Sequence, residues 1–233
     1  RRRLWLVAAP DEISLKRPPA GAAMRKTLTA IPFTLDADEI VAQARVPRGS
    51  SDEADLLSLV ELARQVGRPK AAYAACFVTE RDGDAVRIED VWFRSRTLAR
   101  NLASAERAFA MLATCGREMD EHFPARGDML QEFWWDLIKM RLLGAASRDL
   151  AAHVHRTFRL GKTASMHPGS GDASVWPIEQ QGGLFRLLGG MDEEIGVRLT
   201  DSFLMVPNKT TSGLLFPTER DFRSCEVCHR AEC

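Results

Sequence analysis

The feature that most limits the fold of this chain is a pair of strand-like runs joined by a short turn. Residues 71–79 and 86–93 are rich in aliphatic and aromatic side chains, and residues 81–84 between them read Arg-Asp-Gly-Asp. Asp-Gly is a strong signal for a tight hairpin, and a hairpin pairs its two strands antiparallel. We therefore expect a sheet built on antiparallel pairing.

Helical patterns lie apart from these strands. Residues 36–45 form a short predicted helix, residues 52–66 a better one, residues 128–160 the longest helical region and residues 179–188 a short one. Further strand-like runs are found at residues 108–113, 197–199, 203–206 and 212–216. Because strands and helices are grouped and do not alternate strictly, the order predicts an α+β fold with a mainly antiparallel, twisted sheet and packed helices.

The charge balance excludes several classes of protein. The chain of 233 residues has 32 basic and 32 acidic side chains, so it lacks the positive excess of a protein that coats nucleic acid. The apolar run behind Arg1, Arg2 and Arg3 is too short to span a membrane or to form a signal peptide, and Asp11 and Glu12 interrupt it. We expect a cytoplasmic protein that binds neither nucleic acid nor membrane.

The patterning divides the chain into three parts. Residues 1–30 are the least patterned and are predicted to be an N-terminal arm, while residues 31–222 form the domain. Residues 223–233 form a short tail rich in cysteine. Within the domain, residues 162–177 are rich in Gly, Ser, Pro and Asp, which is typical of a loop. An open sheet edge in such a domain would make a homodimer easy to form.

The tail is a candidate metal site. Cys225 and Cys228 have the Cys-x2-Cys spacing that lets two thiolates hold one metal, and Cys233 can complete a cap of three sulfur ligands. His229 or Cys115 could supply a fourth ligand, or that position could stay open. A [4Fe-4S] cluster and zinc both accept thiolates, so the spacing leaves both open, together with a tail that carries incidental thiols.

Residues 162–172 are a candidate ligand loop. Lys162 could bind a carboxylate or a phosphate, and His167 could stack on a ring or form a hydrogen bond with it. Small residues such as Ala164 and Gly169 would let a ligand approach the backbone. By these features alone, a long solvated loop is an equal alternative.

Two stretches of the chain resemble a known family. Residues 162–168 read Lys-Thr-Ala-Ser-Met-His-Pro, residues 199–207 read Leu-Thr-Asp-Ser-Phe-Leu-Met-Val-Pro, and residues 212–216 read Ser-Gly-Leu-Leu-Phe. In this order and distance they resemble the reactivation domain of cobalamin-dependent methionine synthase. That family has an Arg-x-x-x-Gly-Tyr-Pro loop, a short helix, Leu-Thr-Glu-Ser-Phe-x-Met-x-Pro, and then Ser-Gly-x-x-Phe. The match is firm over residues 162–222 and looser over residues 31–160.

The resemblance implies a methionine synthase activation domain-like fold and an S-adenosylmethionine site. Carried over, Lys162 would meet the ligand carboxylate, Ala164 would offer backbone contacts, and His167 would lie against the ligand, with Pro168 and Gly169 beside it. Lys162 replaces the family's Arg and loses its two-pronged hydrogen bonding, His167 replaces Tyr, and Met166 replaces Gly. Asp36 and Asp38 are candidates for the acidic partner of the ligand's amino group.

The implied function is reactivation of a partner enzyme. A stand-alone reactivation subunit would dock on a cobalamin-dependent methyltransferase or corrinoid protein, which carries the cobalamin, and would support reductive methylation of cob(II)alamin. A tail cluster could supply the electron. The first alternative is an iron–sulfur electron-transfer protein that serves a corrinoid protein without binding S-adenosylmethionine. The second is a binding module with a zinc-tied tail.

Overall fold

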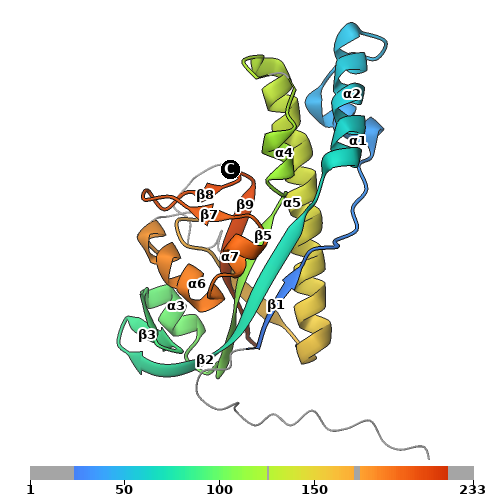
Figure 1. Ribbon diagram of the computed structural model, residues 1–233. Coiled ribbons are helices and arrows are strands. Elements are labelled where there is room, and N and C mark those ends of the chain that lie inside the picture. The colour runs from blue at the N-terminus through green and yellow to red at the C-terminus, as the bar shows by residue number, and fades with distance from the viewer. Residues whose placement is uncertain (1–23, 125, 171–173, 220–233) are drawn as a thin grey trace, which may run out of the picture.

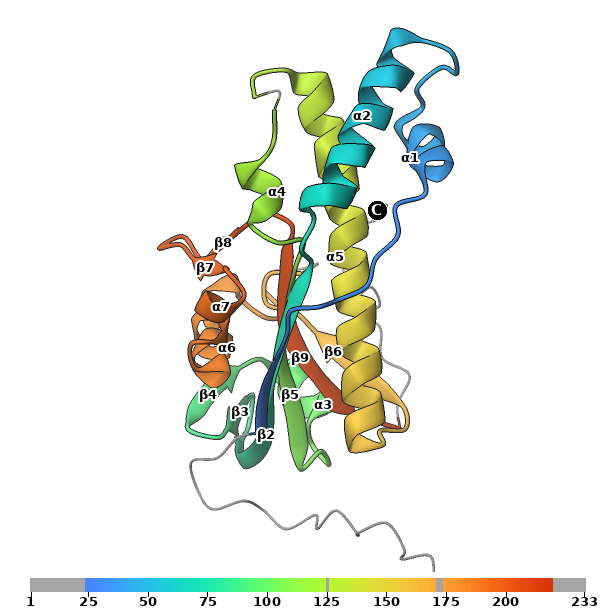
Figure 2. The same cartoon turned by 45° about the vertical axis from the view of Figure 1, so that its right-hand side comes forward.

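The predicted antiparallel sheet is the centre of the structure, a computed structural model that describes residues 24–124, 126–170 and 174–219. Its strands follow the order β4-β3-β2-β5-β9-β6, β1 pairs with the first half of β2, and every neighbouring pair is antiparallel (Figures 1 and 2). A separate two-stranded hairpin joins β7 to β8. The strands are β1 (Met24–Leu28), β2 (Lys70–Asp82), β3 (Ala85–Ile88), β4 (Val91–Arg94), β5 (Arg107–Thr114), β6 (Thr163–Met166), β7 (Arg198–Leu199), β8 (Met205–Val206) and β9 (Thr210–Pro217).

The helices cover both faces of the sheet and extend beyond one end of it (Figures 1 and 2). They are α1 (Ala37–Ala44), α2 (Ser51–Val66), α3 (Arg96–Asn101), α4 (Glu118–Glu121), α5 (Met129–Phe158), α6 (Gln181–Leu188) and α7 (Met191–Glu194), with a 3-10 turn at Ile178–Gln180 before α6. None of the helices in the described ranges is long and apolar enough to cross a membrane.

Two cores form because successive residues of a strand point to opposite faces of the sheet. On β2, Ala72 and Ala74 contribute to the core under α3, α6 and α7, whereas Tyr73 and Ala75 pack on the side of α5. The two helical layers lie on opposite sides of the sheet in Figure 2. The first half of β2 is therefore buried on both faces of the sheet, which explains its long apolar run.

A third core holds the helices at the far end of the molecule. The N-terminal half of α5 packs there against α1, α2 and α4, and Leu56, Trp134 and Ile138 are almost completely buried between them. Asp36 caps α1 by accepting a hydrogen bond from the backbone of Glu39. The long α5 thus connects this helical end to the sheet.

The α+β prediction is confirmed, and several element boundaries change. The strand expected at residues 86–93 is two strands, β3 and β4, because Glu89 has a φ of 51° and turns the chain. The loop expected at residues 162–177 begins with strand β6, and strand β1 lies inside residues 1–30. Both missed strands are only four or five residues long, too short to show a clear alternation.

Candidate functional site

The predicted ligand loop begins as β6, the last strand on its side of the sheet. Ala164 and Met166 point into the core on the α6 side and are 7% and 4% exposed, so Met166 fills space in the core. On the other face, His155 of α5 and the Thr163 hydroxyl are 3.0 Å apart and tie the start of β6 to the long helix. Among the described residues no strand pairs with the outer side of β6.

His167, directly after β6, is half-buried and held by both ring nitrogens. Nδ1 lies 2.8 Å from the carbonyl oxygen of Ser212, and Nε2 lies 3.2 Å from the Ser165 hydroxyl. Because a carbonyl oxygen only accepts hydrogen bonds, Nδ1 carries a proton. Gly213 passes close to the ring: a Cβ atom at this position would lie 2.5 Å from Nδ1 and 2.6 Å from the Met166 carbonyl oxygen. Glycine is therefore required where β9 passes His167.

The other predicted loop residues surround this arrangement. Lys162 is exposed just before β6, and its ammonium group lies 3.4 Å from the carbonyl oxygen of Glu219. Pro168 is buried. Gly169 is exposed, has a φ of 71° and donates a backbone hydrogen bond to Trp176 at 2.8 Å. The loop thus offers a cation at one end and backbone at the other, with His167 between them.

The long motif at residues 199–207 folds as the hairpin β7–β8. The Thr200 amide donates to the Leu204 carbonyl at 2.8 Å, and Phe203 takes a positive φ of 61° in the turn. Gln181 of α6 connects this turn to β9, since its Nε2 donates to the Phe203 carbonyl at 3.0 Å and its Oε1 accepts from the Ser212 hydroxyl at 3.2 Å. Segments far apart in the sequence therefore meet at Ser212.

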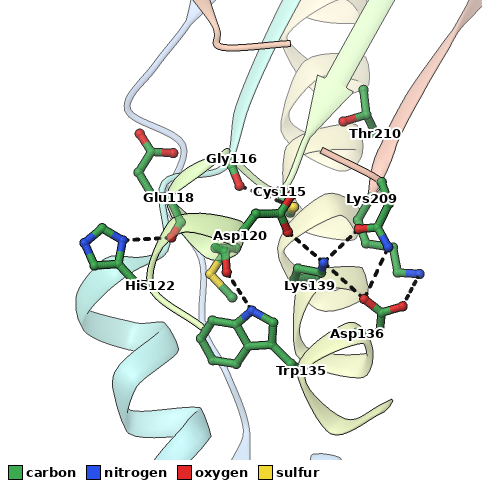
Figure 3. Close-up of polar contacts among 12 residues, drawn as sticks. Cys115, Gly116, Glu118, Asp120, His122, Trp135, Asp136, Lys139, Lys209 and Thr210 are labelled. Atoms are coloured by element: carbon green, nitrogen blue, oxygen red, sulfur yellow. Dashed lines mark hydrogen bonds and ion pairs between the residues drawn. The ribbon is translucent and has the colours of Figure 1, made fainter. Parts of the chain in front are cut away.

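A second polar cluster surrounds Lys139 on the N-terminal half of α5 (Figure 3). Its ammonium group donates to Asp120 and Asn208 at 2.8 Å each and pairs with Asp136 at 3.1 Å, and its side chain is 7% exposed. Lys209 pairs with the second oxygen of Asp136 at 2.8 Å. All three hydrogens of the Lys139 ammonium group thus have an acceptor, so the cluster ties α4, α5 and the β8–β9 segment together.

The ion pairs in this cluster shift two pKa values. Burial acts to lower the pKa of Lys139, but its bonds to Asp120 and Asp136 outweigh burial and raise it. Burial acts to raise the pKa of Asp136, but hydrogen bonds from Lys209 and Lys139 outweigh burial and lower it. Both groups are therefore held in their charged forms.

A cleft of about 610 Å³ opens beside the Lys139 cluster. Phe123 and Trp135 form an apolar wall, with ring centroids 5.5 Å apart in a stacked arrangement. None of the predicted ligand-loop residues lines this cleft, so the predicted site and this large hollow are separate places.

The remaining candidate ligands are placed apart from one another. Cys115 is fully buried, and burial raises the pKa of its thiol to about 12, which suits a structural thiol better than a ligand. Two histidines of α5 that were not candidate ligands also lie apart: the ring of His153 is tilted against Tyr73, whereas His155 contacts Thr163 of β6. The described part of the chain contains no group of three side chains that could hold a metal, and Cys225, Cys228, His229 and Cys233 lie outside it.

Asp36 and Asp38 have partners at the helical end. Asp36 caps α1, and Asp38 forms an ion pair with Arg48 at 2.8 Å. Sequence reasoning included Ser165 and Ser212 in the loop and strand motifs without giving either a role, and it missed Gln181; these three residues connect the site. The signal for Gln181 is that it is a polar residue on the apolar face of a short predicted helix.

Comparison with known proteins supports the fold. No protein-family model matches the sequence, and neither does any curated protein. Among solved structures, the crystal structure of the MetH reactivation domain bound to AdoHcy is similar, with a TM-score of 0.59 and 15% sequence identity over 92% of this chain and 85% of that one. The chain therefore has the fold expected for a reactivation domain, and at this identity the likeness concerns the fold alone.

Proposed function

We propose that this chain, which has the fold of the MetH reactivation domain, is a stand-alone reactivation subunit for a cobalamin-dependent methyltransferase. It binds S-adenosylmethionine at the β6–β9 edge and docks on a partner that carries the cobalamin. One observation carries the proposal: the loop and strand motifs of the resemblance meet at a single point, where His167 bonds to Ser212. The similar solved domain was crystallised with AdoHcy, the demethylated form of this ligand.

The residues of the loop fit the parts of such a ligand. The Lys162 ammonium group attracts a carboxylate as a point charge, without the fork of an Arg. The His167 ring packs against the ligand, and the backbone around Ala164, Pro168 and Gly169 lies within its reach. The chain's own contribution is to orient the methyl donor toward the partner's cofactor. Because Met166 is a core residue, its difference from the family Gly has a structural explanation.

Ligand titration tests this role. We expect S-adenosylmethionine and AdoHcy to bind the full chain saturably in calorimetry. Lys162→Gln should weaken binding about tenfold, because a charge-assisted hydrogen bond is lost. Lys209→Gln, which removes a cation from the Lys139 cluster, should leave affinity unchanged. The chain with S-adenosylmethionine and a reductant should restore an oxidised cobalamin methyltransferase. Absence of both saturable binding and restoration would refute the proposal.

We further propose that Cys225, Cys228 and Cys233 hold a [4Fe-4S] cluster, with zinc as the alternative. A cluster bound by thiolates would supply the low-potential electron that an oxidised corrinoid needs. Iron, sulfide and zinc should be measured in protein purified without oxygen, beside a variant with all three cysteines changed to Ser. Iron and sulfide that disappear in the variant support a cluster, zinc supports a tied tail, and metal unchanged by the variant excludes the tail as its site.

The cluster could also be the whole function, in an electron-transfer protein that serves a corrinoid protein. The replacements at Lys162 and His167 favour this second candidate. It predicts a reducible cluster in a chain that shows no binding of S-adenosylmethionine, so the same titration separates the two functions.

A further inference from the structure

Gln181 is a polar residue inside the core on the α6 side of the sheet. It is 3% exposed, and both ends of its amide are bonded to other elements, to the Phe203 carbonyl 22 residues away and to the Ser212 hydroxyl 31 residues away. A buried amide left without a partner is destabilising, whereas a bonded one fixes the position of whatever it contacts. Gln181 therefore holds the β7–β8 turn and β9 in one relative position.

Ser212 connects Gln181 to His167 through two hydrogen bonds. Its hydroxyl, on the α6 side, bonds to Gln181, while its carbonyl oxygen accepts from Nδ1 of His167 at 2.8 Å. His167 follows the Met166–Leu214 register pair and lies beside Gly213. A short, directional bond of this kind is sensitive to small movements of the carbonyl group.

The bonds at Nδ1 and Nε2 decide what His167 can offer a ligand. In the neutral imidazole Nδ1 donates to Ser212 and Nε2 accepts from Ser165. Both nitrogens are thus bonded within the chain, and the ring is partly exposed, so a ligand would contact ring atoms other than the two nitrogens. His167 therefore differs from a side chain that binds its ligand through a hydrogen bond.

We infer that Gln181 is a positioning residue, which acts through Ser212 to hold His167 as the Nδ1–H tautomer with its ring face toward the ligand. Without the Gln181–Ser212 bond, Ser212 is no longer tied through Gln181 to the β7–β8 turn, so its carbonyl group can move and the bond to Nδ1 weakens. The inference rests on the proposed function only for the identity of the ligand, S-adenosylmethionine.

Gln181→Met tests the inference, because it removes both hydrogen bonds and keeps the length of the side chain. The neighbouring Gln180→Met is a matched control: Gln180 also makes two hydrogen bonds, at 2.7 Å each, but to the backbone of Arg94 on β4. For both variants we would record the ¹⁵N shifts of the His167 ring without ligand, the thermal midpoint, and the Kd for S-adenosylmethionine.

We expect the wild-type chain and Gln180→Met to show the Nδ1–H tautomer. Gln181→Met should show a mixture of tautomers and about five- to tenfold weaker binding. If Gln181→Met loses thermal stability as the control does, while tautomer and Kd stay at wild-type values, Gln181 is only structural and the inference is wrong.

Ser212→Ala is the second variant, and it keeps the test decisive if Gln181→Met does not fold. It removes the Gln181–Ser212 bond, keeps the backbone carbonyl, and should shift the tautomer in the same direction. An unchanged tautomer in Ser212→Ala would overturn the inference. If the wild-type chain binds no S-adenosylmethionine, the proposed function fails, whereas the ring shifts, measured without ligand, still decide the role of Gln181.

Discussion

The two halves of α5 satisfy buried polar groups in different ways. Beside the N-terminal half, Lys139 is surrounded by Asp120, Asp136 and Asn208, and the contacts are ionic. Beside the C-terminal half, His155 meets Thr163, and the polar groups of the β6–β9 edge bond through hydroxyls, amides and ring nitrogens. One helix therefore borders an ionic cluster at one end and a chain of neutral hydrogen bonds at the other.

This difference indicates separate tasks for the two regions. Charge pairs tolerate variation in angle, so the Lys139 cluster can join α4, α5 and the β8–β9 segment without exact geometry. Hydrogen bonds to ring nitrogens are directional and specify one tautomer and one ring orientation. The ionic end is suited to holding elements together, and the neutral end to presenting a ring to a ligand.

The largest loss of stability should come from removing the ion pairs of the Lys139 cluster. Lys139→Met leaves Asp120, Asp136 and Asn208 without their shared donor, and we expect it to lower the free energy of unfolding by about 2–3 kcal/mol. This is less than for a fully buried pair, because the side chains of both carboxylates are about 40% exposed. Urea denaturation measures the loss.

Lys209→Met is the control for this change, because Lys209 pairs with Asp136 and is more exposed. It should cost under about 1 kcal/mol. Equal losses in the two lysine variants would contradict the central place of Lys139. S-adenosylmethionine affinity should stay unchanged in any folded Lys139 variant, since the cluster lies outside the ligand loop.

Close packing is the vulnerable feature of the neutral end. Gly213→Ala would place a methyl group 2.5 Å from Nδ1 of His167 and 2.6 Å from the Met166 carbonyl, so we expect a loss of about 2 kcal/mol and weaker ligand binding. Gly182→Ala, in α6, meets nothing within 4 Å and should be neutral or slightly stabilising. A Gly213→Ala chain as stable as Gly182→Ala would show that His167 does not pack there.

The pH dependence of stability should separate the two ends. The pKa of Asp136 lies below its ordinary value of 3.8 and that of Lys139 above 10.5. The Asp136 contribution is present above pH 3.8 and lost as the pH falls through the lowered pKa. The Lys139 contribution is present below pH 10.5 and lost as the pH rises through the raised pKa.

The stability difference between wild type and Lys139→Met should therefore be constant from about pH 5 to 9 and shrink below about pH 4. The difference between wild type and Gly213→Ala is steric and should show no such decrease at acid pH. Urea titrations at several pH values measure both. A Lys139 difference that persists undiminished at the acid end would show that the ion pairs contribute little.

The sequence predicts the fold better than the site, for a physical reason. Asp-Gly between two apolar runs and the long helical pattern at residues 128–160 are local signals, and both elements are found. Glu89 takes a positive φ without being glycine, so the break between β3 and β4 had no local signal. Nothing along α5 distinguishes Lys139 from a solvated lysine, because its partners lie at distant positions in the sequence.

In the candidate site, too, the sequence gives local signals but does not predict contacts between distant residues. The resemblance identified the loop at residues 162–168 and the motifs at residues 199–207 and 212–216, but not Gln181, and the bonds of Gln181 and Ser212 that join these stretches depend on tertiary contacts. Gln181 appears in the sequence as one polar residue in a short helix. Its role depends on the Phe203 carbonyl and the Ser212 hydroxyl, which contact it only in the folded chain.

The smallest loss of stability is expected for a variant that tests whether α5 helps to place the ligand loop. His155→Phe removes the bond to the Thr163 hydroxyl and keeps an aromatic ring, and we expect a loss of about 0.5–1 kcal/mol. Thr163→Val should cost a similar amount, and the double variant should lose little more, since both changes remove one interaction. Additive losses would mean that the two residues act independently. A Kd for S-adenosylmethionine that rises with the stability loss would connect the neutral end of α5 to the ligand loop, whereas an unchanged Kd would confine His155 to folding.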